Sequence, residues 1–211
     1  ELVRSLKNMI RISNRPNSQA DPWKLWNEAR NIVDDLLRSQ PNNPTYQYEY
    51  ALLFIHKLPR GRSPVPLSRV RDRLQEAITV CDRLQRRYQH IPEYKKLVAH
   101  ALYNRAEFEL RDNSLRGTFD GLISARELLI DSIEIQRSLV NQFPDSLQYQ
   151  IRLNQSLHRL SEIHDRMGQT ENARSVLEGT IKEFDRFIDD HSKFEDARRI
   201  LISDYDLLAV L

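Results

Sequence analysis

Apolar residues recur at intervals of three and four along most of the chain, in runs that come in pairs around a short polar turn. An aromatic residue follows each turn and sets the register of the pattern. Successive aromatic anchors are 48, 55 and 45 residues apart, so the period is irregular while its content repeats. The anchors are Tyr46, Tyr94, Tyr149 and, in a weaker fourth copy, Phe194.

Positions at fixed distances from the anchors are apolar in every copy, which predicts one helix before and one helix after each turn. Ten residues before the anchors stand Leu36, Leu84, Leu139 and Phe184. Eight residues after them stand Phe54, Leu102, Leu157 and Ile202. The first helices are expected at about 23–39, 68–88, 119–142 and 170–188. The second helices are expected at about 45–57, 93–111, 146–166 and 193–210.

The turns carry residues that start helices. Pro44 and Pro92 fit the first turn of a second helix, where a missing N–H costs no hydrogen bond. Asp145, with Gln148 three residues later, matches a capping box at the start of another. The chain has only five glycines, and its nine prolines lie mostly between the apolar runs, which is typical of helices joined by short connections.

The pattern therefore predicts an all-α fold without β-sheet, a single-layer stack of about four antiparallel hairpins forming an α-solenoid of long helices. Residues 1–20 are expected to be a short helical lead-in, and residues 21–211 one helical-repeat domain. The repeats within it are about 23–58, 68–111, 119–166 and 170–210. The chain begins with Glu1 and ends in the apolar string Leu207, Leu208, Ala209, Val210 and Leu211. We expect an excised segment of a longer protein, with this string packed on the fourth hairpin.

Composition narrows the classes of partner. The chain has 32 Lys and Arg against 30 Asp and Glu, so no general field attracts nucleic acid or an acidic membrane. The longest apolar stretch, Ala51 to Ile55, is far too short to span a bilayer. We expect neither nucleic-acid binding nor membrane contact by this segment, and its compartment, cytoplasmic or periplasmic, stays open.

No constellation of catalytic residues stands out. His158, Glu162 and His164 are the only clustered metal-type residues, and a site would need further ligands from another helix, so ordinary surface histidines are the favoured interpretation. Cys81 lies on the apolar stripe, which favours a small buried residue over a nucleophile. Phosphate-binding loops and hydrolase motifs are absent from the sequence. We therefore expect no enzyme, no metal and no cofactor.

The segment from Ser138 to Tyr149, continuing through Leu153 and Leu157 to Met167–Ala173, resembles the tetratricopeptide-like arrays of large bacterial signalling proteins. Such arrays are often attached to serine/threonine protein kinase domains or to membrane-anchored regulators. The resemblance is close over 119–188, fair over 23–110 and poor at the last turn, where Asp189-Asp190-His191 replaces the proline. It implies a helical-repeat architecture in a signalling or regulatory protein.

Three sets of surface residues are candidates for binding a partner. The first lies twelve residues before the anchors, acidic in two copies and basic in two: Asp34, Asp82, Arg137 and Lys182. The second consists of Trp23 and Tyr48, aromatic residues that the repeat core does not explain. The third is a basic patch formed by Arg60, Arg62, Arg69 and Arg73. It could hold a phosphate or an acidic peptide, although a solvated loop rich in arginine is the favoured interpretation.

These features favour a non-catalytic scaffold that binds a protein or peptide in a groove lined by the first helices. The alternative is a ligand-sensing module of a membrane-anchored regulator, with a small molecule held between hairpins. A pocket lined by convergent polar groups would favour the alternative.

Overall fold

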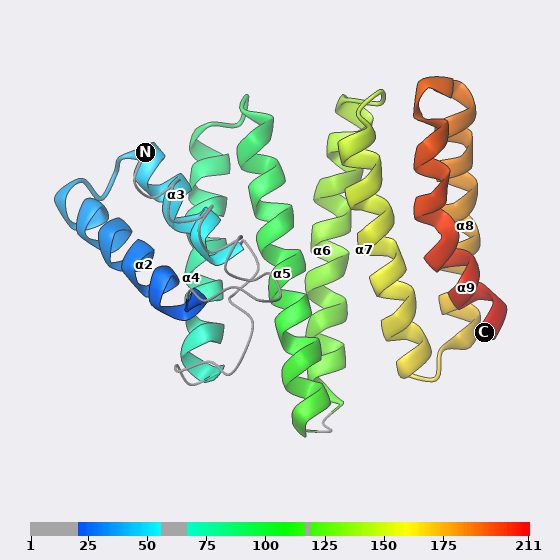
Figure 1. Ribbon diagram of the computed structural model, residues 1–211, viewed down its shortest axis with the longest axis horizontal. Helices are drawn as coiled ribbons and strands as arrows, with labels where there is room; N and C mark the ends of the chain where they lie inside the picture. The colour runs from blue at the N-terminus through cyan, green and yellow to red at the C-terminus, as the bar shows by residue number, and fades with distance from the viewer. Residues whose placement is uncertain (1–20, 56–66, 117–118) are drawn as a thin grey trace. The chain divides into compact units, whose positions relative to one another are not determined.

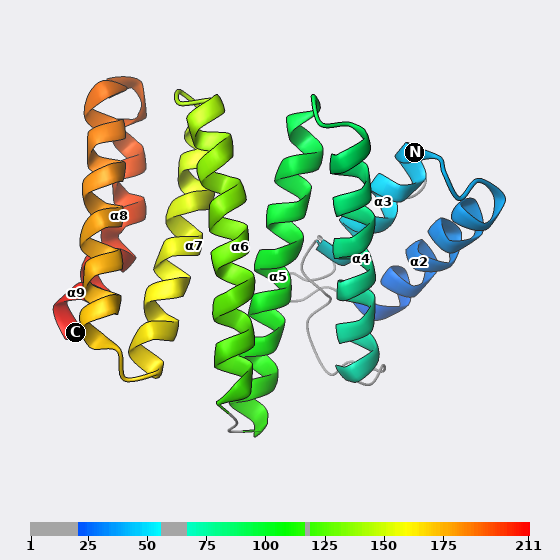
Figure 2. The same cartoon turned by 180° about the vertical axis from the view of Figure 1, so that it is seen from behind.

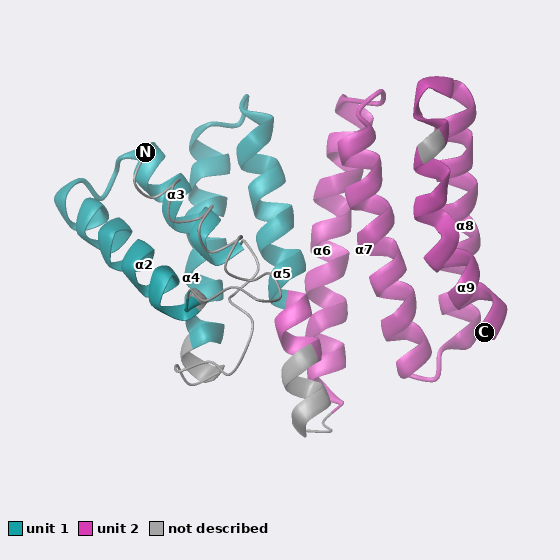
Figure 3. Cartoon of the chain, viewed as in Figure 1, with its two compact units in different colours: residues 1–105 teal, residues 106–211 magenta. Residues whose placement is uncertain are grey.

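A computed structural model describes residues 21–55, 67–116 and 119–211, and every regular element in these ranges is helical. The chain forms two compact units, Glu1–Arg105 and Ala106–Leu211, with the division inside one helix (Figure 3). Sequence periodicity predicted a single repeat domain over 21–211, and that boundary stays a prediction. None of the described helices is both long enough and apolar enough to span a membrane.

The first unit holds two helical hairpins (Figure 1). Its helices are α2 (Pro22–Ser39), α3 (Pro44–Ile55), α4 (Leu67–Arg87) and α5 (Pro92–Arg116), the last of which belongs to this unit through Arg105. Packing joins α2 to α3 and α3 to α4. The side-chain amide of Asn104 on α5 donates to the main-chain oxygen of Ile55, the last residue of α3.

Capping explains where these helices begin. The carboxylate of Asp21 accepts the backbone N–H of Trp23 at 2.9 Å, and Pro22 occupies the first turn of α2. Asn43 does the same before α3, accepting from the N–H of Thr45 at 3.0 Å. Helices α3 and α5 begin at Pro44 and Pro92, which confirms the predicted role of both prolines.

The second unit holds the remaining hairpins, seen from both sides in Figures 1 and 2. Its elements after α5 are α6 (Asp120–Gln142), α7 (Leu147–Arg166), α8 (Thr170–Asp190), the 3₁₀ helix η1 (Ser192–Leu201) and α9 (Ile202–Val210). Packing joins α6 to α7, α7 to α8, and α8 to both η1 and α9.

Two connections in this unit show how its turns work. Gly168, between α7 and α8, has a φ of 73°, a left-handed conformation that glycine adopts without steric cost. The N–H of Gln169 then bonds the carbonyl of His164 at 2.8 Å, which ends α7. The predicted capping box at Asp145 does not form, because α7 begins at Leu147 with Ser146 as its N-cap. Asp145 lies one residue too early and meets Nε2 of His191 at 3.0 Å instead.

Burial confirms the predicted repeat register in most positions. Leu84, Leu139 and Phe184 are buried at equivalent places on α4, α6 and α8, whereas Leu36 on α2 is only half-buried. Cys81 is fully buried, and this burial raises the pKa of its thiol. After the anchors, the equivalent apolar residues are buried in the first three copies: Phe54, Leu102 and Leu157.

The last hairpin departs from the prediction. An α-helix was expected over 193–210, but residues 192–201 form a 3₁₀ helix that opens with a kink at Phe194. A 3₁₀ helix rotates further per residue than an α-helix. The residue that faces the core therefore comes one position earlier in the sequence. Leu201 fills the core position and Ile202, expected inside, is 59% exposed. The missing proline at this turn is the sequence difference that accompanies the change.

The C-terminal apolar string is only partly packed. Leu207 and Leu208 are half-buried, as expected for a string that packs on the fourth hairpin. Val210 is 80% exposed, so the expectation is wrong for this end of the string. The cluster at this end of the unit is instead built by α8 and η1, around Phe184, Phe187, Ile188, Ala197 and Leu201.

Candidate functional site

The row of charges on the first helices lies at equivalent positions, as the register requires, but most of its members are paired. In the first unit, Asp34 pairs with Arg30 at 3.9 Å and Asp82 pairs with Arg86 at 3.0 Å, each within its own helix. Both acidic residues therefore present a weaker field than the sequence suggests.

In the second unit, the row links neighbouring first helices. Nη1 of Arg137 on α6 lies 3.4 Å from a carboxylate oxygen of Glu183 on α8. Lys182, next to Glu183 in sequence, is exposed on α8. The surface of this row is thus shared by two successive hairpins.

The aromatic candidates lie deeper than expected. Trp23 is only 8% exposed, and its ring packs edge-on against Trp26 with a centroid separation of 5.8 Å. The expectation of an exposed anchor is therefore wrong for Trp23, because the ring joins the core of the first hairpin. Tyr48 is half-buried and meets Tyr94 of α5 edge-on at 5.9 Å.

The proposed basic patch is only partly described. Arg60 and Arg62 lie outside the described residues, and Arg69 lies in α4 without a described side chain. Nη1 of Arg73 lies 2.8 Å from a carboxylate oxygen of Glu76, one turn later on the same helix. Arg73 is therefore a paired cation, which weakens its claim on a phosphate.

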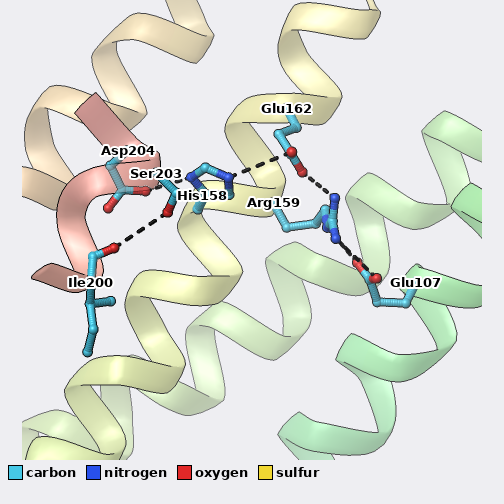
Figure 4. Close-up of polar contacts among 7 residues, drawn as sticks. All are labelled: Glu107, His158, Arg159, Glu162, Ile200, Ser203 and Asp204. Atoms are coloured by element: carbon cyan, nitrogen blue, oxygen red, sulfur yellow. Dashed lines mark hydrogen bonds and ion pairs between the residues drawn. The ribbon is translucent and has the colours of Figure 1, made fainter. Parts of the chain in front are cut away.

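A chain of polar side chains in the second unit is the most organised polar cluster among the described residues (Figure 4). It starts at Asp204 of α9, a carboxylate with 0% exposure. Nδ2 of Asn154 donates to Oδ2 of Asp204 at 2.8 Å, and Nδ1 of His158 lies 2.6 Å from Oδ1. Both donors come from α7, so these contacts tie α9 to α7.

The chain of polar side chains continues along α7 and reaches α5. Nε2 of His158 lies 3.6 Å from Oε1 of Glu162, and Glu162 forms an ion pair with Arg159. Nη2 of Arg159 donates to Oε2 of Glu107, on the part of α5 that belongs to this unit, at 3.2 Å. Negative and positive groups alternate through five residues, which lowers the cost of burying each one.

The pKa of His158 follows from this arrangement. Its hydrogen bond to Asp204 and its contact with Glu162 outweigh burial and raise the pKa of His158 to about 9. Burial alone would raise the pKa of Glu162, but His158 and Arg159 reverse that effect and lower it. His158 is therefore a cation at neutral pH, held between two carboxylates.

These contacts argue against acid–base chemistry at His158. A general base needs a free nitrogen lone pair, and here both ring nitrogens face a carboxylate and carry protons at neutral pH. The nearby hydroxyl of Ser203 donates to the carbonyl of Ile200 at 3.4 Å, so it is not aligned with the histidine as a nucleophile (Figure 4).

The cluster also differs from a metal site. His164 is the third residue of the cluster His158, Glu162 and His164 that the sequence suggested. Its Nδ1 lies 2.7 Å from Oε1 of Gln169, away from His158. Within the described ranges, no group of three or more His, Cys, Asp or Glu is arranged to hold a metal ion.

Sequence reasoning found two members of this chain and missed the rest. The spacing of four residues places His158 and Glu162 on one helix face, but it favours an ordinary surface histidine at 158, which is wrong because His158 contacts the buried Asp204. The available signal was Asp204, an acidic residue three positions after Leu201 and four before Leu208 on the inward stripe of the last helix. A carboxylate at such a position requires buried donors opposite it.

Comparisons with known proteins support the architecture alone. No protein-family model and no curated protein matches the chain. Among solved structures, the chain resembles the de novo designed helical repeat protein DHR64, with a TM-score of 0.50, 16% identity, and coverage of 89% of this chain and 93% of that one. It also resembles the DHF58 filament, with a TM-score of 0.50, 15% identity, and coverage of 91% and 95%. At such low identity these likenesses show a helical-repeat fold.

Proposed function

We propose that the chain is a non-catalytic scaffold of a bacterial signalling or regulatory protein, and that it binds a protein or peptide along its first helices. The observation that carries the proposal is the ion pair between Arg137 and Glu183, which joins the first helices of two successive hairpins. It supports a continuous surface over the two hairpins of the second unit, built from equivalent positions of neighbouring repeats, which is how helical-repeat proteins bind extended partners.

Charge is expected to supply specificity on the first helices of each unit. The row is acidic in the first unit, at Asp34 and Asp82, and basic in the second, at Arg137 and Lys182. Because three of the four have ion-pair partners, their contribution lies in steering and orienting a partner more than in affinity. Lys182 is the strongest single candidate for a direct contact with an acidic residue of the partner.

A peptide library displayed on phage tests the proposal without knowledge of the natural partner. Peptides selected on the wild-type chain are expected to lose affinity for Arg137→Glu/Lys182→Glu, and this loss should be largest at low salt and smaller at high salt, where the charges are screened. Asp34→Lys/Asp82→Lys tests the acidic half in the same way, and Arg38→Glu, an exposed position outside the row, is the matched control. Selected peptides that bind all variants equally at low and high salt would show that this surface is not the recognition site.

The alternative, a small molecule held between hairpins, requires polar groups that converge on an empty space. The polar side chains that converge most closely in the second unit, around His158 and Asp204, bond to one another. The scaffold is therefore the function that the contacts favour.

A further inference from the structure

Exposed apolar side chains gather on the last helix. Five large hydrophobic residues are exposed among the described residues, and three of them lie on α9. Ile202 is 59% exposed, Tyr205 is 48% exposed and Val210 is 80% exposed. A concentration of this kind on one short helix marks an interaction surface more often than isolated apolar residues do.

The repeat register shows what kind of surface this is. After the one-residue slip that puts Leu201 in the place of Leu157, Ile202 corresponds to His158 and Tyr205 to Ser161. On α7 these positions are covered, since His158 bonds Asp204 of α9 and Ser161 is fully buried. The positions through which α7 contacts the next helix therefore have equivalents on α9, and on α9 apolar side chains occupy them.

The charges beside this row are self-complementary. Arg199 and Asp206 are both exposed, and no ion pair joins either of them to another described residue. Arg199 and Asp206 are separated by two residue steps of 3₁₀ helix and five of α-helix. The total rotation about the helix axis brings Asp206 to within about 20° of Arg199. A cation and an anion therefore flank Ile202 on one side of the helix, three residues before it and four after it.

We propose that this face, defined as Arg199, Ile202, Tyr205 and Asp206, binds a second copy of the chain by antiparallel two-fold pairing of α9. In a two-fold interface, residue i of one copy meets residue j of the other, and j meets i. The midpoint between Arg199 and Asp206 falls between Ile202 and Ser203, so an axis there sets each Arg199 against Asp206 of the second copy. The two Ile202 side chains meet at the axis, and the Tyr205 rings flank them.

The size of the face determines the strength of the association. One helix of nine residues with the end of η1 provides a small interface, of the class below about 1,200 Å² that forms transient complexes. Dissociation constants between about 10 µM and 1 mM are expected for such contacts. The inference is independent of the charged row on the first helices, because it concerns a different face and a different partner.

Sedimentation equilibrium of the full 211-residue chain between about 10 µM and 1 mM tests the association directly. The average mass is expected to rise above that of the monomer with concentration. Arg199→Asp and Asp206→Arg each replace two attractions by two repulsions and are expected to weaken the dimer about tenfold. The double variant Arg199→Asp/Asp206→Arg restores both pairs and is expected to recover wild-type association. Arg38→Asp on α2, with the same change in net charge as Arg199→Asp, is the control and should have no effect.

Disulfide trapping tests the geometry, because a residue on a two-fold axis meets its own copy. Ile202→Cys is expected to oxidise to a covalent dimer at least about tenfold faster than Glu134→Cys, an exposed control on α6. The single native thiol, Cys81, is fully buried and does not compete. A monomer at every concentration, a double charge variant as weak as the single ones, or equal trapping rates at 202 and 134 would each overturn the proposal.

Discussion

Removal of the Asp204 carboxylate is expected to flatten the dependence of the second unit's stability on pH between 6.5 and 9, because it removes the larger of the two contacts that hold the proton on His158. In the folded chain, Asp204 and Glu162 raise the pKa of His158 from its ordinary 6.5 to about 9. Each pKa unit corresponds to about 1.4 kcal/mol, so the protonated histidine contributes roughly 3 kcal/mol to folding. The side chain of His158 is 21% exposed, so solvent screens its interactions only in part.

The direction of the pH dependence follows from the raised pKa. The contribution is fully present below pH 6.5, where His158 is protonated in both the folded and the unfolded chain. It declines as pH rises and is lost as pH passes about 9, where the folded chain also gives up the proton. The wild-type chain is therefore expected to lose roughly 3 kcal/mol of unfolding free energy between pH 6.5 and pH 9.5.

Urea unfolding followed by far-ultraviolet circular dichroism at four pH values measures this slope. Asp204→Asn keeps the shape of the side chain and an acceptor for Asn154, but it removes the charge that holds the proton on His158. This variant is expected to be less stable by about 2 to 3 kcal/mol at pH 6.5 and to show a much flatter pH profile.

His164→Asn is the matched control, since His164 lies on the same helix and contacts an amide rather than a carboxylate. It should retain the wild-type slope. If Asp204→Asn and the wild-type chain lose the same stability between pH 6.5 and 9.5, the buried contact does not govern the protonation of His158 and our reasoning is wrong.

Two further pairs of substitutions test the core and the turns. Leu139→Ala, at a buried site, is expected to lower the unfolding free energy by about 2 to 5 kcal/mol. Leu36→Ala, at a half-buried site, should lower it clearly less. Equal losses of unfolding free energy in urea titrations would contradict the burial pattern. Gly168→Ala is expected to destabilise by about 1 kcal/mol because its φ is positive, while Gly179→Ala, inside α8 with open space around it, should stabilise by up to about 1 kcal/mol. Thermal midpoints that move in the same direction for both glycine variants would refute the assignment of the turn.

Periodicity predicted most of the fold because each hairpin places apolar residues at equivalent positions that must be buried. The first helices were predicted to within two residues of their bounds, since a stripe of offsets three and four identifies a helix without reference to its neighbours. The prediction failed at the last hairpin, where the faster turn of η1 moved the core position from Ile202 to Leu201. Offsets measured from an anchor assume a constant helical pitch, and a change in pitch is not visible in the pattern.

The polar chain could not be predicted for a different reason. Asp204 and Asn154 are 50 residues apart in sequence, and periodicity says only that each faces inward. Which inward positions meet across two hairpins depends on the stagger between them, and no local pattern specifies this stagger. His158 illustrates the problem, since the same spacing to Glu162 fits an exposed ion pair as well as a bridge to a buried carboxylate.

The buried Asp204 also bears on how hairpins find their neighbours during folding. Apolar stripes on repeated hairpins are interchangeable, so a hairpin from one chain can take the place of its equivalent in another and produce domain-swapped species. A hairpin that carries Asp204 can satisfy its carboxylate only against a helix that offers both Asn154 and His158 at the matching stagger. Any other docking strands a buried charge, at a cost of several kcal/mol. Replacing this trio by apolar residues of similar volume would therefore trade fidelity of assembly for stability, and swapped oligomers are its expected product during refolding at high concentration.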